Sequence, residues 1–138
     1  MKIQPYSPKY ETAVIALWQK CDLTRPHNDP HKDIARKMKV NPELFLIGLE
    51  GDKVVATAMG GYDGHRGWVN YVGVDPDYQR KRIGQQIMQA VEKALLAKGC
   101  PKFNLLVRTD NLSAIEFYRS LGFNQEDCVE MGKRLIPD

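Results

Sequence analysis

Residues 68–84 read WVNYVGVDPDYQRKRIG, and this stretch decides how the rest of the chain is interpreted. Its first part is rich in aromatic and β-branched residues, which predicts a strand that breaks at Asp75-Pro76. A polar loop follows, made of Gln79, Arg80, Lys81 and Arg82, and a helical pattern begins at Ile83-Gly84. Free backbone N–H groups and the positive end of a helix dipole meet at such a junction. The stretch therefore predicts a site for a ligand that carries phosphate.

The same residues carry a resemblance to a known family. Val74, Pro76, Tyr78, Gln79 and Gly84 resemble the central motif of the GNAT superfamily of N-acetyltransferases, which use acetyl-coenzyme A. One residue departs from that motif, because Arg82 stands where the family has its inner glycine. A glycine there lets the backbone approach the pyrophosphate closely. A guanidinium can replace that approach with a side-chain contact to phosphate.

A second motif lies about thirty residues further along the chain. Asn111, Ala114, Phe117-Tyr118 and Leu121-Gly122-Phe123 are similar to the C-terminal signature of the same superfamily. Two motifs in the right order make a chance match improbable. Residues 25–30 (RPHNDP) and 60–67 (GGYDGHRG) further resemble a subgroup of small bacterial members, the YpeA-like acetyltransferases.

Composition and length narrow the class of protein. A chain of 138 residues, with 43% hydrophobic and 27% charged residues, is expected to form one domain over residues 1–138. No apolar run approaches the roughly 18 residues that span a bilayer, and the first residues lack the apolar core of a signal peptide. The three cysteines are widely spaced, which favours reduced thiols and a cytoplasmic protein. A net charge of +3 is too small to indicate nucleic-acid binding.

Periodicity predicts the order of the elements. Strands are expected at 1–6, 44–49, 53–59, 68–74 and 103–107, with one or two closing strands after Phe123, of which 128–135 fits better. Helices are expected after the Ser7-Pro8 and Asp29-Pro30 caps, from Ile83 to Gly99, and after Asp110 or Asn111. This is an α/β (α+β) fold with a mixed sheet of six to seven strands and about four helices. The order matches the GNAT fold over the whole chain.

The resemblance implies how the coenzyme is bound. The strand that ends at Val72-Gly73-Val74 would splay from the 103–107 strand, so that pantetheine lies between them on the main chain of Val72 and Val74. The 79–84 loop, Ile83 and Gly84 included, would hold the phosphates. Tyr118 would be the general acid near the coenzyme sulfur, and it could donate a proton to the departing thiolate. Asn111 is either a helix N-cap or a coenzyme contact.

The sequence does not single out a general base. Alternation with a period of two puts Trp68, Asn70 and Val72 on one face, and none of them can accept a proton at neutral pH. Asp63 and His65 in the preceding turn are the nearest titratable candidates, followed by residues of the first interhelix loop, namely Asp22, His27 and Asp29. Water is the alternative. No metal site is expected, because His27 and His31 flank Pro30 and no third ligand follows at a suitable spacing.

The amine acceptor is expected between the 22–29 loop and the 62–67 turn. The candidate contacts are Trp18, Arg25, Tyr62, Asp63, His65 and Tyr71, which suit a small polar or peptidic amine. The sequence thus favours an acetyl-CoA-dependent N-acetyltransferase. The rival interpretation is a non-catalytic acyl-CoA sensor on the same fold. No nucleic-acid or membrane partner is expected, and assembly as a homodimer is left open.

Overall fold

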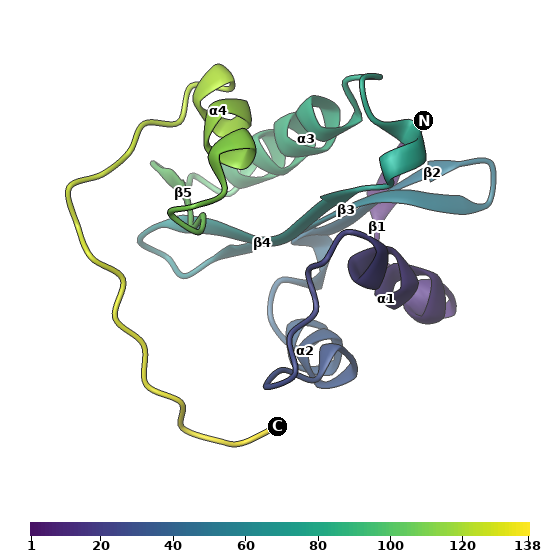
Figure 1. Cartoon of the computed structure of the whole chain (residues 1–138), viewed down its shortest axis with the longest axis horizontal. Helices are drawn as coiled ribbons and strands as arrows, with labels where there is room; N and C mark the ends of the chain where they lie inside the picture. Colours follow the sequence, from purple (N-terminus) through teal and green to yellow (C-terminus); the bar gives the residue numbers. More distant parts are fainter.

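The computed structural model describes all residues, 1–138, and is built on one five-stranded sheet (Figure 1). The strands lie side by side in chain order: β1 (Lys2–Pro5), β2 (Phe45–Glu50), β3 (Lys53–Tyr62), β4 (Gly67–Val74) and β5 (Phe103–Leu105). Neighbouring strands are antiparallel except β4 and β5, which are parallel. The sheet is therefore mixed, as expected.

Four α-helices cover the two faces of this sheet. Helices α1 (Glu11–Lys20) and α2 (Pro30–Lys37) lie on one face, and α3 (Ile83–Ala97) and α4 (Leu112–Ser120) on the other (Figure 1). Short 3₁₀ turns precede α1, β2 and α3, at Pro8–Tyr10, Pro42–Leu44 and Pro76–Tyr78. None of the helices combines the length and the apolar composition that a membrane span requires. The expected number of helices is confirmed.

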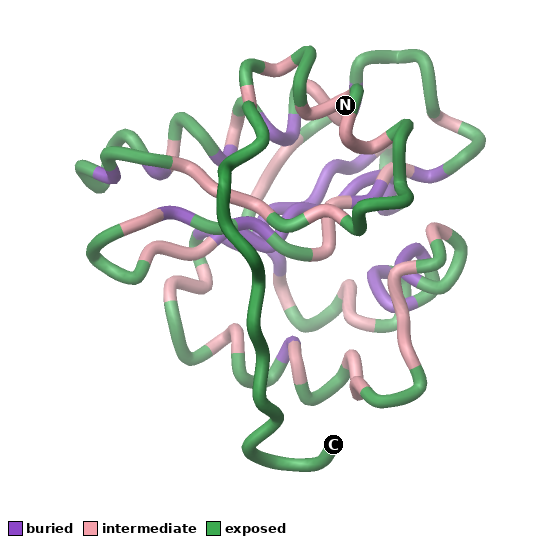
Figure 2. The backbone as a smooth tube through the Cα atoms, turned by 60° about the vertical axis from the view of Figure 1, so that its left-hand side comes forward, coloured by how far each residue is buried: buried purple, intermediate pink, exposed green.

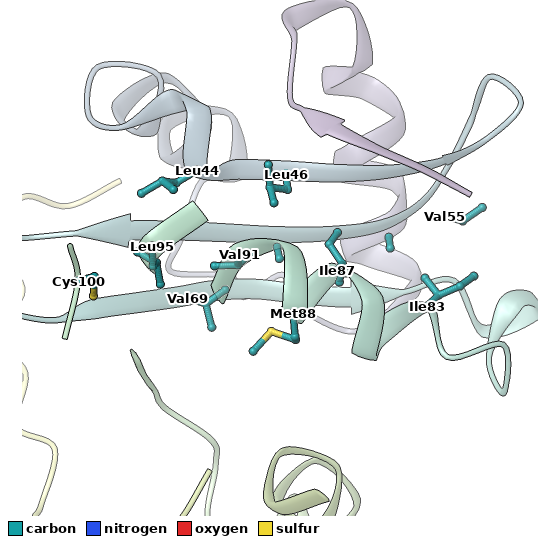
Figure 3. Packing of buried hydrophobic residues seen from close by; sticks show 12 residues of the cluster. Leu44, Leu46, Val55, Val69, Ile83, Ile87, Met88, Val91, Leu95 and Cys100 are labelled. Atoms are coloured by element: carbon teal, nitrogen blue, oxygen red, sulfur yellow. The ribbon is translucent and has the colours of Figure 1, made fainter. Parts of the chain in front are cut away.

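The cores on the two faces follow from the apolar periodicity of the helices. On one side Ile83, Ile87, Val91 and Leu95 of α3 point onto the sheet at helical spacing (Figure 3). On the other side α1 supplies Val14, Leu17 and Trp18, which pack against buried residues of β2 and β3 such as Phe45, Ile47 and Met59. Strands β2 and β3 between these layers are buried on both faces, which explains the nearly continuous apolar run of β2.

The prediction of a closing strand is wrong, because the sheet has five strands instead of six or seven. Residues 124–138 form no helix or strand and run along the outside, from the α4 layer to α2 (Figures 1 and 2). Neighbouring β5 has only three residues, so it offers a short edge for pairing. Val129 and Met131 are 86% and 92% exposed, so the apolar side chains of this segment do not pack on the core. Side-chain bonds near Arg134 and Asp138 hold this segment instead.

Candidate active site

The second half of β4 has a partner on one side only. Strand β5 pairs with Gly67, Trp68 and Val69 and then ends, while β3 continues to pair as far as Val74. The N–H of Asp75 donates to the Val55 carbonyl of β3 over 2.8 Å. Successive residues of a strand direct their N–H groups to opposite sides. The N–H groups of Val72 and Val74 therefore face the open side, where an extended ligand can pair with them.

A β-bulge lies where β4 leaves β5. Met59 pairs with Asn70 and Thr57 with Gly73, so β4 has one residue more than β3 over this interval. Tyr71 has a φ of 51°, which is unusual for a residue with a side chain. The extra residue means that strict alternation is wrong here. Val69 and Val72, three residues apart, both pack on the α3 side, whereas Tyr71 packs on the α1 side.

The polar loop after β4 leads into a helix N-terminus with no side-chain cap. Arg82 stands at the N-cap of α3 and gives it no side-chain bond, and the first intrahelical bond runs from Gln86 N to the Arg82 carbonyl over 3.0 Å. The N–H groups of Ile83, Gly84 and Gln85 thus have no partner within the helix. The side chains of Gln79, Arg80, Lys81 and Arg82 are exposed. Free donors and positive charge meet here, as an anion site requires.

Arg82 adopts the backbone conformation that a glycine would adopt easily. Its φ is 59° and that of Arg80 is 67°, both in the left-handed region. Such a conformation costs about 1–2 kcal/mol for a residue with a side chain. Arg82 therefore has a conformation that a glycine could also adopt, and it adds a guanidinium at some cost in backbone strain.

Asp75 fixes the junction between β4 and this loop, and sequence reasoning missed it as a site residue. Its side chain is 3% exposed, and Lys20 lies 3.0 Å and Lys53 3.7 Å from its oxygens. Its Oδ1 also accepts from the Asp77 N–H over 2.9 Å. Burial alone would raise the pKa of Asp75, but the Asp77 N–H and the Lys20 ammonium lower it below the usual value. The signal in the sequence was an aspartate directly before a proline.

Helix α4 brings Tyr118 to the same side of the sheet as Val72 and Val74. A Cβ on Gly84 would lie 3.0 Å from the Phe117 ring and 3.6 Å from Val74, so this glycine lets α3, α4 and β4 approach closely. Tyr118 packs edge-on against Phe117 and Phe123. Burial raises the pKa of Tyr118 to about 12. Its phenol therefore keeps its proton at neutral pH.

Asn111 acts as the N-cap of α4. Its side-chain oxygen accepts from the Ala114 N–H over 3.2 Å. This is one of the two roles expected for Asn111, and it accounts for the residue without a ligand.

The residues expected at the acceptor site do not all face one shared space. Trp18 is fully buried, so the expectation that its side chain contacts an acceptor is corrected: it stacks on Tyr71 with ring centroids 3.7 Å apart. The Tyr71 hydroxyl donates to Asp33 over 2.6 Å. Arg25 donates to the carbonyls of Asp22 and Thr24, so it braces its own loop. Leu23, at the start of that loop, lies beside Gly73.

The structure separates the 62–67 turn from the open half of β4. Gly67 and Val74 are the two ends of the strand, roughly 20 Å apart at an extended rise. Within the turn the Tyr62 hydroxyl donates to the Gly64 carbonyl, and Asp63 accepts from the N–H groups of Arg66 and His65 over 2.6 and 2.7 Å. These two N–H groups hold the pKa of Asp63 below its usual value. The 62–67 turn therefore lies at the other end of β4 from Gly73, which Leu23 of the 22–29 loop contacts, and Asp63 is poorly suited to be the base.

The fold and the site have the features that the sequence led us to expect: a mixed sheet in which β4 extends beyond β5, and an uncapped helix N-terminus beside it. The family model described as "Acetyltransferase (GNAT) family" matches residues 11–123, and the chain belongs to this family of acetyltransferases. An acetyltransferase of Pectobacterium atrosepticum is 46% identical over 138 residues, covering 100% of this chain and 98% of the relative. No group of three or more His, Cys, Asp or Glu side chains is placed to hold a metal ion.

Solved structures share the fold at low sequence identity. The ribosomal-protein-S18-alanine N-acetyltransferase of Escherichia coli superposes with a TM-score of 0.77 at 24% identity, over 91% of this chain and 78% of that one. AAC(6')-Iy in complex with the bisubstrate analogue CoA-S-monomethyl-acetylneamine gives a TM-score of 0.80 at 15% identity, over 97% and 98% of the two chains. At such identities the likeness shows the fold alone.

Proposed function

We propose that the chain transfers acetyl from acetyl-CoA to a primary amine of a small molecule or peptide by direct attack. The observation that carries the proposal is the open edge of β4, with the N–H groups of Val72 and Val74, next to the uncapped N-terminus of α3. An extended, amide-containing chain that ends in phosphates complements both features. The pantetheine and pyrophosphate parts of coenzyme A have this chemistry.

The polar loop is proposed to hold the phosphates. The N–H groups of Ile83 and Gly84 would donate to phosphate oxygens, and Arg80, Lys81 and Arg82 would add charge. On the strand, main-chain donors at Val72 and Val74 would pair with pantetheine, and a donor at the splay would polarise the thioester carbonyl. These contacts need only the backbone on β4, so the valine side chains remain free to pack in the core.

The proposed reaction transfers acetyl from the thioester to the amine through a tetrahedral intermediate. A neutral amine attacks the thioester carbon, the C–N bond forms, and the carbonyl oxygen carries the negative charge of the tetrahedral intermediate. The C–S bond then breaks, and Tyr118 gives its proton to the thiolate. The nitrogen loses a proton to water, and the tyrosinate regains one from solvent. A pKa of about 12 keeps the phenol protonated at neutral pH, so Tyr118 carries a proton to give and cannot be a resting base.

The acceptor is proposed to approach where the 22–29 loop meets β4. Leu23 and Cys21 lie against Gly73, and the Cys21 thiol donates to the Val74 carbonyl over 3.3 Å. Tyr71 lies beside them on the same face of the sheet as α1. Burial raises the pKa of Cys21, so its thiol is a poor nucleophile and a direct transfer to the amine is favoured over a cysteine-bound intermediate.

A thiol-release screen tests the proposed function. The purified chain is given acetyl-CoA with amino acids, polyamines, aminoglycosides and peptides with free N-termini, and coenzyme binding is measured in parallel by calorimetry. The proposal expects binding together with release of coenzyme A in at least one amine class. Binding without turnover in any class would support the acyl-CoA sensor instead. Absence of binding would contradict both.

A further inference from the structure

The bulge in β4 needs an explanation of its own, because Tyr71 is held in a conformation that side chains disfavour. Its φ of 51° lies in the left-handed region, where aromatic residues are rarely found. Such a conformation persists only where the surrounding structure fixes it. Three contacts fix Tyr71: Trp18 stacks on its ring, Asp33 accepts from its hydroxyl, and Thr57 donates to its carbonyl oxygen over 2.8 Å.

Thr57 is the contact that acts on the main chain. Thr57 is completely buried, and the only other buried polar residue is Asp75. Its hydroxyl accepts from the Trp18 indole N–H over 2.9 Å while it donates to Tyr71. A valine would fill the same space in the apolar run of β3. The hydroxyl is therefore explained by the two polar groups that it satisfies in the core, the indole N–H and the bulge carbonyl.

The bulge decides which groups of β4 reach the open edge. With one extra residue at Tyr71-Val72, the N–H groups of Val72 and Val74 face away from β3. A shift of the register by one residue would turn these N–H groups toward β3 and move each side chain to the other face of the sheet. The bulge begins after Asn70, one residue beyond Val69, which is the last residue that pairs with β5. The geometry of the open edge thus depends on the conformation of Tyr71.

We propose that Thr57 is a positioning residue for acetyl transfer. By holding the Tyr71 carbonyl, and by being held itself by Trp18, it keeps the N–H groups of Val72 and Val74 directed at the coenzyme. The role rests on the proposed function for its effect on turnover, but its effect on coenzyme binding does not require an acceptor. Thr57 is buried beneath the strand and acts only through Tyr71.

Two substitutions at the same position test this role. Thr57→Val keeps the shape and removes the hydroxyl, whereas Thr57→Ser keeps the hydroxyl and removes a methyl group. We expect Thr57→Val to bind acetyl-CoA roughly tenfold more weakly and to lower kcat by a similar factor, since small misplacements at a site are costly. Thr57→Ser should stay within about threefold of the wild type. The amide NMR signals of Val72 and Val74 should shift in the valine variant and not in the serine variant.

A matched control separates position from stability. Ile47→Val, a buried change on the α1 side of β2, removes a methyl group from the same core without touching a hydrogen bond. It should lower Tm and leave coenzyme affinity unchanged. The proposal is overturned if folded Thr57→Val keeps wild-type affinity and kcat, or if Thr57→Ser is as impaired as Thr57→Val.

The proposed function and the role of Thr57 can fail separately. A wild-type chain that binds acetyl-CoA but acetylates no amine removes the function, while the affinities and amide signals of the Thr57 variants still decide its role. Should Thr57→Val not fold, Trp18→Phe takes its place, because it keeps an aromatic ring on Tyr71 and removes the donor that orients Thr57. Weaker coenzyme binding is then expected, and unchanged binding with unshifted Val72 and Val74 signals overturns the proposal.

Discussion

The two halves of β4 have similar sequences and different surroundings. Gly67–Val69 lies between β3 and β5, and its backbone pairs on both sides. Tyr71–Val74 has β3 alone as a neighbour, through the pairs at Gly73 and Val74, because β5 ends at Leu105. The first half is thus scaffold and the second half is a binding edge, within one strand of eight residues. The two halves differ in whether β5 lies beside them. Substitutions in the first half should therefore affect stability, and substitutions in the second half should affect binding and turnover.

The largest effect is expected at Tyr118, which lies on the side of the open half. Tyr118→Phe keeps the ring and its contacts with Phe117 and Phe123, so folding should change little. The lost proton donor should lower kcat roughly a hundredfold, at the low end of acid–base contributions because a thiol leaves readily. Coenzyme affinity should stay within a few-fold. Single-turnover kinetics is the measurement, since product release can mask the chemical step; full single-turnover activity would leave Tyr118 a packing residue only.

The next effect concerns the loop that follows the open half. Arg82→Glu places a carboxylate where phosphates are proposed to bind, and it should raise the Kd for acetyl-CoA by roughly tenfold or more. Arg82→Gly is the matched variant, because glycine adopts a φ of 59° without strain. It should bind the coenzyme nearly as well as the wild type and be somewhat more stable. Calorimetry that finds equal affinity for the glutamate variant would show that only the backbone of this loop matters.

Two glycines allow a direct comparison of the halves. A Cβ on Gly67 would lie 2.8 Å from Leu95 and 2.9 Å from Cys100, so Gly67→Ala overpacks the core. It should lower the free energy of unfolding by about 1–3 kcal/mol and leave coenzyme affinity unchanged. A Cβ on Gly73 would meet Leu23 at 3.0 Å, and Gly73→Ala should mainly raise the KM for the acceptor. Denaturant unfolding and steady-state kinetics on both variants check this, and the reverse pattern would break the comparison.

The smallest effect is expected where the open half ends, at Asp75. Asp75→Asn weakens the bonds with Lys20 and the Asp77 N–H, and it should destabilise the fold at neutral pH by about 1–2 kcal/mol. Because the pKa of Asp75 is lowered in the folded state, its contribution is present above the unfolded value near 4 and is lost as the pH falls through the lowered folded value. The difference in unfolding free energy between the two proteins should therefore be smaller at pH 3 than at pH 7. The same difference in unfolding free energy at both pH values would show that the effect comes from packing and not from the charge of Asp75.

Much of the fold could be predicted from local patterns. The strand that breaks at Asp75-Pro76, the helix from Ile83 and the caps at Asp29 and Asn111 each follow from a few neighbouring residues, and the structure has them. The missing sixth strand could not be predicted in this way. Residues 128–135 include apolar residues such as Val129 and Met131, but a strand also needs an edge to pair with, and β5 ends after three residues.

The site was harder to predict than the fold because its geometry depends on one extra residue. Nothing in the letters around Asn70-Tyr71 marks a bulge, since Tyr is common in regular strands. The signal lies in β3, where Thr57 interrupts an apolar run, but its meaning emerges only when Trp18 and Tyr71 are brought beside it. The sequence also does not show that Trp18 is buried. It was expected to contact the acceptor, whereas it supports β4 from the core.

Amide hydrogen exchange in β4, followed by NMR, tests the central claim most directly. In the free protein the N–H groups of Val72 and Val74 should exchange fast and that of Val69 slowly, because only the first half is paired on both sides. Saturating acetyl-CoA should slow Val72 and Val74 by roughly tenfold or more and so narrow the gap to Val69. Val72 and Val74 that are already slow, or that remain fast with coenzyme bound, would contradict the account that the open half of β4 is the coenzyme edge.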